Sequence, residues 1–248
     1  MDEISKLQEL IDGSDNIVFF GGAGVSTESG IKDFRSVDGL YHQQYEYPPE
    51  TILSHTFYVR EKEEFYKFYR DKLLEKTVGT DCVERAKPNA AHITLAKLEA
   101  AGKLKAVITQ NIDGLHQEAG SKKVLELHGS VHRNYCEHCR KEFDAKYMFH
   151  SLGIPVCDVC GSSIKPDVVL YEEGLDNSII TEAVRCISDA DLLIIGGTSL
   201  VVYPAAGLID YYNGNKLVLI NRDSTPKDNQ ADYVFHANIG EILGAIKV

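Results

Sequence analysis

Residues 16–35 read NIVFFGGAGVSTESGIKDFR, an apolar run that ends in a cluster of glycines. The run over 16–21 predicts a buried strand of a parallel sheet, because such strands are covered by helices on both faces. Gly22 and Gly24 match the first half of a dinucleotide-binding fingerprint, whose backbone N–H groups hold a pyrophosphate. The third glycine position holds Thr27. Two interpretations stay open: a phosphate-binding loop, or a strand-to-helix turn that needs glycine for steric reasons.

Five further apolar runs have the same character as the first. They cover residues 105–110, 123–129, 191–197, 216–221 and 232–237. Helical segments lie between several of them, and one is predicted to start at the N-cap Asn89 and to stop at Gly102. Strands that alternate with helices predict an α/β fold with a Rossmann-like, doubly wound parallel sheet.

Two segments interrupt this alternation. Residues 36–85 contain no clear buried strand and include EEFYKFYRDKLLEK, a predicted amphipathic helix, while residues 132–165 are rich in cysteine and turns. We expect a helical insertion at 36–85 and a zinc-binding insertion at 132–165, which together form a smaller domain. The Rossmann-like domain is then assembled from residues 1–35, 86–131 and 166–248.

Four cysteines have the spacing of a metal site. Cys136 and Cys139 form one C-x-x-C pair, and Cys157 and Cys160 form another. Four thiolates make a closed tetrahedral zinc site, which is structural because no position is left for water. The segment 132–165 holds five Lys/Arg against four acids, so this ribbon lacks the electrostatic footprint of a nucleic-acid binder.

The composition is that of an ordinary globular protein, with 44% hydrophobic and 25% charged residues in 248. A formal net charge of -11 argues against non-specific nucleic-acid binding and permits basic partners, although solubility alone explains it. No apolar run reaches the length of a membrane span. The start MDEISKLQEL is no signal peptide, so a cytoplasmic location is expected.

Polar clusters follow several of the predicted strands, at the edge where such sheets build their sites. They are TQNIDGLHQEAG (109–120), ELHGS (126–130), GGTSLVVYPA (196–205) and INRD (220–223). His128 ends one strand just before Gly129, which makes it a candidate catalytic residue. The acid that binds ribose in dehydrogenases is missing, because residues 41–50 form no second strand. Ordinary hydride transfer is therefore disfavoured.

These stretches resemble the sirtuin family of NAD-dependent protein-lysine deacylases. The matching segments are GAGVSTESGI-DFR, KPNAAH, TQNIDGLH, LHGS, the four cysteines, KPDVVLYE, GTSLVVYPA and LIN. They follow the family's order from about residue 17 to residue 221. The resemblance implies removal of acetyl groups from protein lysines, with nicotinamide and O-acetyl-ADP-ribose as products. NAD, one structural Zn²⁺ and acetyl-lysine-containing proteins or peptides are the implied cofactors and partners.

The resemblance also implies roles for individual residues. His128 would be the general base for a ribose hydroxyl, with Asn111 as the second catalytic residue, and Asp113 would bind the nicotinamide carboxamide. Val169 and Tyr171 would wall the acyl-lysine tunnel, and the substrate would pair as an added strand. The residues implied to contact NAD are Ala23, Thr27, Phe34, Arg35, Gln110, Ile112, Asp113, Thr198, Ser199, Asn221 and Ile239.

Two positions depart from the family pattern. Lys32 replaces a proline, and Tyr171-Glu172-Glu173 replaces Phe-Gly-Glu. The alternative activities are desuccinylation or demalonylation, and mono-ADP-ribosyl transfer from the same NAD pocket. Desuccinylases of the family use a Tyr-x-x-Arg pair, whereas here the arginine, Arg70, comes four positions after Tyr66. A zinc-ribbon interaction module without catalysis is disfavoured by His128 and Asp113, and a zinc hydrolase by the closed metal site.

Overall fold

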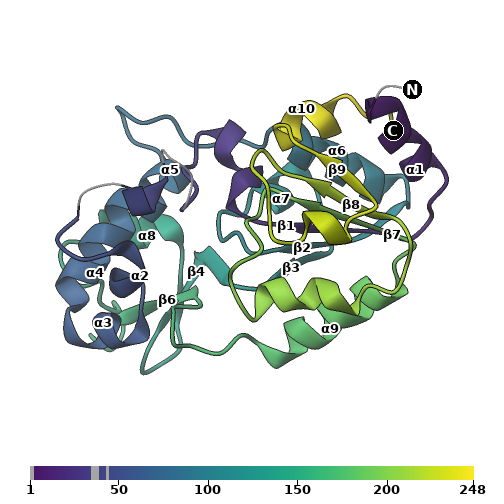
Figure 1. The fold of residues 1–248 in the computed structure, drawn as a ribbon. Helices are drawn as coiled ribbons and strands as arrows, with labels where there is room; N and C mark the ends of the chain where they lie inside the picture. The colour runs from purple at the N-terminus through teal and green to yellow at the C-terminus, as the bar shows by residue number, and fades with distance from the viewer. Residues whose placement is uncertain (1–2, 35–38, 43–44) are drawn as a thin grey trace.

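The larger part of the molecule is organised around a twisted sheet of six parallel strands (Figure 1). The computed structural model describes residues 3–34, 39–42 and 45–248. The strand order is β3-β2-β1-β7-β8-β9. The chain adds β2 and β3 on one side of β1, and later adds β7, β8 and β9 on the other side. The strands are β1 (Ile17–Gly21), β2 (Leu104–Thr109), β3 (Val124–Glu126), β7 (Leu192–Gly196), β8 (Leu217–Ile220) and β9 (Tyr233–Phe235). All six predicted runs are strands, and the doubly wound α/β fold is confirmed.

Helices cover both faces of this sheet, which is why its central strands are apolar throughout. One face carries α1 (Glu3–Asp12), α6 (Ala90–Ala100) and α10 (Ile239–Gly244). The opposite face carries α9 (Asn177–Asp189) and the 3₁₀ segment Ala205–Tyr211. The short α7 (Leu115–Ala119) packs against α6. Asn89 caps α6 as predicted, because its side chain accepts a hydrogen bond from the Ala91 N–H at 3.0 Å.

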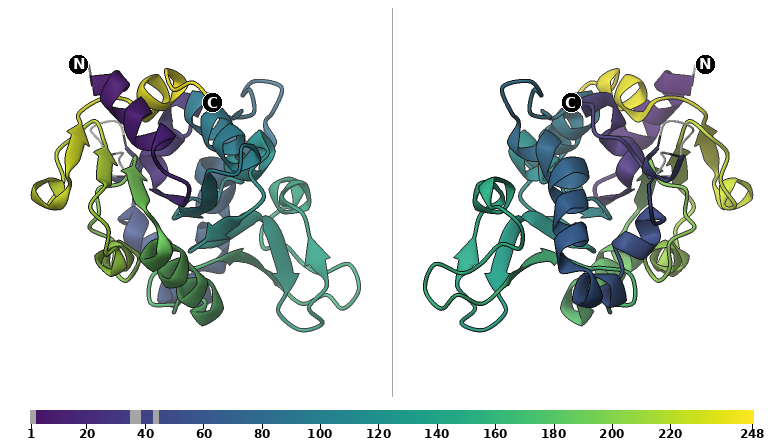
Figure 2. Two further views of the ribbon diagram at one scale, coloured as in Figure 1. Left: turned by 90° about the vertical axis from the view of Figure 1, so that its right-hand side faces the viewer. Right: turned by 90° about the vertical axis from the view of Figure 1, so that its left-hand side faces the viewer.

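The smaller part has its own hydrophobic core, drawn from two separate stretches of sequence (Figure 2). Its sheet has the order β5-β4-β6 and is antiparallel. The strands are β4 (Gly129–Cys136), β5 (Glu142–Phe143) and β6 (Ile164–Val168). The helices are α2 (Pro49–Ile52), α3 (His55–Arg60), α4 (Lys62–Phe68), α5 (Glu75–Val78) and α8 (Ala145–His150). Tyr58, Phe65 and Tyr66 are fully buried at its centre.

Two local features differ from the sequence prediction. The helix predicted from residue 63 continues from α4 into α5 only through a π-helical turn, Tyr69–Leu74. This turn shifts the buried face by one residue, so that Tyr69 and Leu74, five positions apart, are both buried. After β1 the strand-to-helix turn considered from the sequence is instead two 3₁₀ turns, Ala23–Val25 and Thr27–Ser29.

Within the described ranges, no helix is both long and apolar enough to cross a membrane.

Candidate active site

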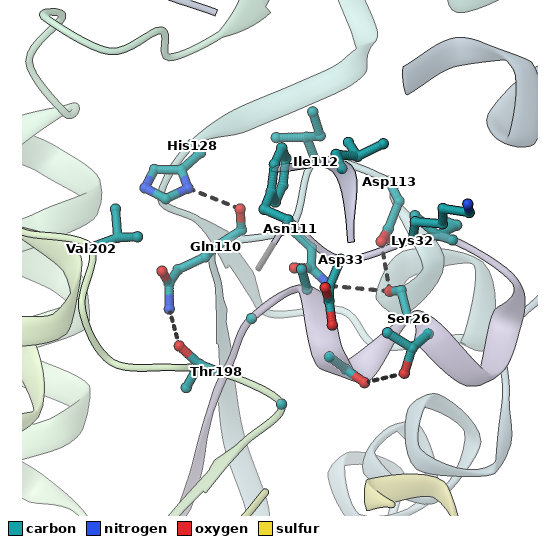
Figure 3. Close-up of a pocket in the computed structure, with 18 of the residues that line it drawn as sticks. Ser26, Lys32, Asp33, Gln110, Asn111, Ile112, Asp113, His128, Thr198 and Val202 are labelled. Atoms are coloured by element: carbon teal, nitrogen blue, oxygen red, sulfur yellow. Dashed lines mark hydrogen bonds between the residues drawn. The ribbon is translucent and has the colours of Figure 1, made fainter. Parts of the chain in front are cut away.

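A cavity of about 660 Å³ lies at the carboxyl ends of the central parallel strands (Figure 3). Its volume is within the range of small-molecule and cofactor sites. The predicted site residues that line it are Ala23, Thr27, Phe34, Gln110, Asn111, Ile112, Asp113, His128, Val169, Tyr171, Thr198, Ser199, Asn221 and Ile239. Arg35 lies outside the described residues. The chain thus brings seven separate segments of the predicted site to one place.

His128 is oriented by a backbone carbonyl. Its Nδ1 lies 2.9 Å from the carbonyl oxygen of Gln110, and a carbonyl only accepts, so Nδ1 carries the ring proton. Nε2 is left with a lone pair, and Figure 3 shows it on the side of the ring away from this bond. Burial lowers the pKa of His128, against a smaller opposing effect of the Gln110 bond. The ring is therefore neutral at pH 7 and can accept a proton at Nε2.

Gly129 allows the strand to turn directly after this histidine. Its φ of +73° is a left-handed conformation that favours glycine, and a Cβ there would lie 1.9 Å from the Asp167 carbonyl oxygen. The approach of β4 to β6 at this point also lets the Val169 N–H donate to the His128 carbonyl at 3.0 Å. The catalytic candidate and the candidate substrate segment are thus fixed to each other through backbone.

Asp113, Ser26 and Asn111 form a hydrogen-bonded chain across the cavity wall (Figure 3). The Ser26 hydroxyl donates to Asp113 Oδ2 at 2.7 Å and accepts from the Asn111 amide at 3.1 Å. The Leu115 N–H donates to the other carboxylate oxygen at 2.9 Å. Burial raises the pKa of Asp113, and these hydrogen bonds oppose that rise. The carboxylate keeps further lone pairs with which it can accept from a carboxamide.

The glycines of the first loop bring two loops into close contact. The Gly24 N–H donates to the Gly197 carbonyl at 2.8 Å, and a Cβ on Gly24 would lie 2.8 Å from Gly197 Cα. A Cβ on Gly22 would lie 2.8 Å from the Thr198 side chain. These glycines are therefore needed for steric reasons. The same loop lines the cavity, which is also compatible with a phosphate-binding role. Thr198 Oγ1 in turn accepts from the Gln110 amide at 3.1 Å.

The donor set suits NAD. One cavity is lined by amide groups of Gln110 and Asn111, the Asp113 carboxylate, the Ser199 hydroxyl and Asn221, which follows β8. These amide, hydroxyl and carboxylate groups match the hydrogen-bonding groups of a ribose and a carboxamide. The backbone turns after β1 lie where this fold type holds a pyrophosphate.

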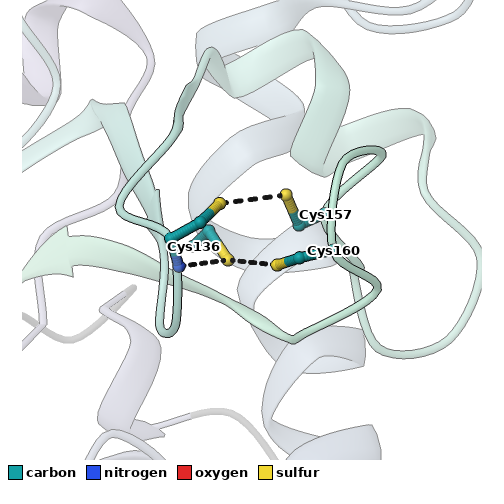
Figure 4. A group of neighbouring side chains, drawn as sticks. Cys136, Cys157 and Cys160 are labelled. Atoms are coloured by element: carbon teal, nitrogen blue, oxygen red, sulfur yellow. Dashed lines mark hydrogen bonds between the residues drawn. The ribbon is translucent and has the colours of Figure 1, made fainter.

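The four cysteines converge on one point, as the spacing predicts (Figure 4). All four Sγ atoms lie within 4.8 Å of one another, with Cys136–Cys160 at 3.4 Å and Cys139–Cys157 at 3.6 Å. A tetrahedral Zn²⁺ with bonds of about 2.3 Å needs sulfur atoms about 3.8 Å apart. The cluster therefore fits a closed, structural zinc site. His138, beside it, is exposed.

Sequence reasoning missed several residues of the cavity. Ser26 stands in the quoted loop, but only the fold shows that it supports Asp113. Residues 71–73 and 75–77 line the wall that belongs to the smaller core, and nothing in the sequence places them there. Glu172 adopts φ +75° where the family has glycine, and its carboxylate accepts from the Thr56 N–H at 2.9 Å and hydroxyl at 2.6 Å. The extra side chain therefore binds the start of α3.

Comparison with known proteins identifies the family. The model of the Sir2 family matches residues 22–204. A Clostridium acetobutylicum protein named NAD-dependent protein deacetylase is 59% identical over 99% of this chain and 98% of its own, and a Clostridium perfringens protein of the same name is 58% identical over 99% and 98%. The solved structure "Sir2-p53 peptide-NAD+" is 40% identical with a TM-score of 0.84, over 98% of this chain and 96% of that one. "Sir2 bound to acetylated peptide" has the same TM-score at 39% identity, over 98% and 96%. The chain belongs to the Sir2 family.

Proposed function

We propose that this chain is an NAD-dependent protein-lysine deacetylase, which moves an acetyl group from lysine to ADP-ribose and releases nicotinamide. The observation that carries the proposal is His128, a neutral imidazole whose proton is fixed at Nδ1 by the Gln110 carbonyl in a cavity lined by Asn111 and Asp113. Relatives that cover nearly the whole chain are named for this activity.

NAD, when bound, supplies a ribose carbon that loses nicotinamide and a ribose hydroxyl that accepts the acetyl group. His128 Nε2 accepts the proton of that hydroxyl, and its Nδ1 remains bonded to Gln110 throughout. Asp113 accepts hydrogen bonds from the carboxamide, and Ser26 holds it in place. Asn111 donates to Ser26, so a shift of either residue disturbs both.

The acetyl-lysine enters beside the segment that follows β6. Val169 and Tyr171 line the cavity there, and Val202, from the segment after β7, lines it as well (Figure 3). An extended peptide between these two segments would form backbone hydrogen bonds with both. Phe34, also in the lining, provides an apolar surface for the lysine side chain.

The acyl group that fits best is acetyl. Arg70 donates to the Gly153 carbonyl at 2.8 Å, and the Tyr66 hydroxyl donates to the Ile164 carbonyl. Neither residue is among the described residues that line the cavity. The shifted Tyr-Arg pair is thus engaged elsewhere, which disfavours desuccinylation and demalonylation.

The decisive experiment is mass spectrometry of an acetyl-lysine peptide incubated with the protein, with and without NAD. We expect the acetyl group to leave the peptide only with NAD, and nicotinamide and O-acetyl-ADP-ribose to form in equal amounts. Two results together would instead establish mono-ADP-ribosyl transfer: ADP-ribose attached to the peptide or to the enzyme, and nicotinamide release that does not depend on the acetyl group. No NAD binding would leave the zinc-ribbon module as the better hypothesis.

Three further expectations stay predictions. The division into a Rossmann-like domain and a smaller domain of residues 36–85 and 132–165 is testable by limited proteolysis. Absence of direct nucleic-acid binding is testable by titration with duplex DNA and with RNA. A cytoplasmic location suits a site of four reduced thiolates, since thiols persist in reducing compartments, and cell fractionation tests it.

A further inference from the structure

Two tyrosine hydroxyls meet at the edge of the cavity. The Oη atoms of Tyr41 and Tyr171 lie 2.7 Å apart, within hydrogen-bond distance. Tyr171 follows the substrate-facing strand and is 37% exposed. Tyr41 belongs to the segment after the cofactor-facing loop, and its ring packs on Phe34 with centroids 5.6 Å apart. The contact joins the two parts of the cavity that are expected to hold different substrates.

The backbone at Tyr41 is hydrogen-bonded to that of the cavity-lining residues Asp33 and Phe34. The Leu40 N–H donates to the Asp33 carbonyl, and the Tyr41 N–H donates to the Phe34 carbonyl, both at 2.9 Å. Gly39 allows this close approach, because a Cβ there would lie 2.8 Å from Asp33 Oδ1 and from the Phe34 backbone. A displacement of Tyr41 therefore displaces Asp33 and Phe34 as well.

Tyr171 is anchored on its other side. Its N–H donates to the Leu53 carbonyl at 3.0 Å, and its carbonyl accepts from the His55 N–H at 2.9 Å. The next residue, Glu172, is bound by Thr56 through both carboxylate contacts described above. The Tyr171 hydroxyl thus stands on backbone that is held by the start of α3, independently of the cofactor-facing loop.

We propose that Tyr41 and Tyr171 are positioning residues for NAD, whose hydroxyl contact holds Asp33 and Phe34 in the cofactor-binding arrangement before any peptide binds. The proposal deepens the proposed function and rests on it. Without the contact, a smaller fraction of the free protein has the binding arrangement, and the apparent NAD affinity falls by that fraction. A bound acetyl-lysine packs on Phe34 and restores part of the arrangement. Tyr41 is not among the described residues that line the cavity, so loss of its hydroxyl should leave turnover at saturation unchanged.

The test measures NAD binding by calorimetry for the full chain and for Tyr41→Phe, Tyr171→Phe and the double variant, with and without acetyl-lysine peptide. One hydrogen bond corresponds to a two- to tenfold weaker NAD affinity in each single variant without peptide. We expect no further loss in the double variant, a smaller loss with peptide and a raised KM for NAD. An unchanged kcat is expected of Tyr41→Phe alone, because Tyr41 is not among the described residues that line the cavity. Tyr211→Phe, which removes an exposed hydroxyl outside the cavity lining, is the matched control.

Either of two results overturns the proposal: NAD affinity that is unchanged in both single variants, or losses that multiply in the double variant and so show two independent effects. A lowered melting temperature that accounts for the affinity loss also overturns it. Wild-type protein that binds NAD but leaves the acetyl peptide intact contradicts the proposed function alone, because the calorimetric comparison does not depend on turnover.

Discussion

At the scale of single residues, burial acts on the two central side chains of the cavity in opposite directions. It lowers the pKa of His128 and raises that of Asp113, so both are moved toward their neutral forms. His128 gains from this, because a general base must be unprotonated. Asp113 is kept available as an acceptor by hydrogen bonds from Ser26 and Leu115, which oppose the effect of burial.

The first prediction concerns His128. Since its pKa lies below the ordinary 6.5, the base form persists as pH falls through 6.5, and kcat/KM for the acetyl peptide should decline only at lower pH. His128→Ala should lower kcat by about 10²- to 10⁴-fold with the fold and NAD affinity intact. Steady-state kinetics over pH 5–8 and NAD calorimetry measure both effects. Turnover within a few-fold of wild type would remove His128 from the base role.

Asp113→Asn should weaken NAD binding and inhibition by nicotinamide. An amide oxygen is a weaker acceptor than a carboxylate, and the new NH₂ group faces donors from Ser26 and Leu115. Nicotinamide titration of the deacetylation rate measures the change. Asp189→Asn, at the exposed end of α9, is the control and should behave as wild type. Equal nicotinamide sensitivity in the two variants would place the carboxamide elsewhere.

The sequence predicted 14 residues that line the cavity but not their hydrogen bonds. His128 was predictable because it ends an apolar run at the carboxyl edge of the sheet, whereas Asp113 was predicted from the family resemblance. The tautomer of His128 depends on the Gln110 carbonyl, which approaches only when β2 and β3 pair. The left-handed backbone conformation of Glu172 could not be predicted from the sequence either, because the contact with Thr56 that explains it forms only in the fold.

At the scale of elements, the helical stretch from α4 to α5 decides what the cavity wall can bind. Its π-helical turn buries Tyr69 and directs Arg70 to the Gly153 carbonyl. Periodicity predicted a helix here but not the turn, because the extra residue breaks the period on which the prediction depends. The six parallel strands were predictable for the opposite reason, since burial on both faces makes each one apolar along its length.

This element leads to a prediction on acyl preference. With Tyr66 and Arg70 bonded outside the cavity, a succinyl carboxylate would enter without its arginine partner, and partial desolvation of the charge costs at least about 3 kcal/mol. Acetyl should therefore exceed succinyl in kcat/KM by about 100-fold or more. The measurement uses one peptide in both acylated forms. Arg70→Met is the matched variant and should leave the ratio unchanged; comparable succinyl turnover that this variant abolishes would reverse the assignment.

The pairing of α6 with α7 buries two histidines whose rings lie 4.7 Å apart, His92 and His116. Burial lowers their pKa values to about 4 and about 3. Below pH 6.5 the unfolded chain binds protons that the folded chain does not, so stability should fall between pH 6.5 and pH 4. Thermal melts of wild type and His116→Leu test this, and the variant should lose less across that interval. His150→Gln, exposed, is the control. Parallel curves for wild type and His116→Leu would contradict the account.

At the scale of the whole molecule, the cavity lies between two hydrophobic cores that are stabilised differently. The parallel sheet is covered by long helices on both faces, whereas the smaller core is assembled from short helices and a three-stranded sheet. Cys136 and Cys157 are buried within that smaller core, which also contains the aromatic side chains of Tyr58, Phe65 and Tyr66. The same core contains Leu74, with Leu73 packed against it, and both belong to the stretch that supplies one wall of the cavity.

The last prediction follows from this arrangement. Removal of zinc by a chelator, or Cys139→Ala, should lower the melting temperature and the deacetylation rate together, because the binding energy of a closed four-thiolate site is folding energy. Calorimetric melts, metal analysis and the peptide assay give the three readouts. Cys82→Ala is the control, since this exposed cysteine lies outside the cluster. Readdition of Zn²⁺ to the chelated protein should restore both properties. Metal-free protein that melts at the wild-type temperature and remains fully active would show that the smaller core does not need the ion.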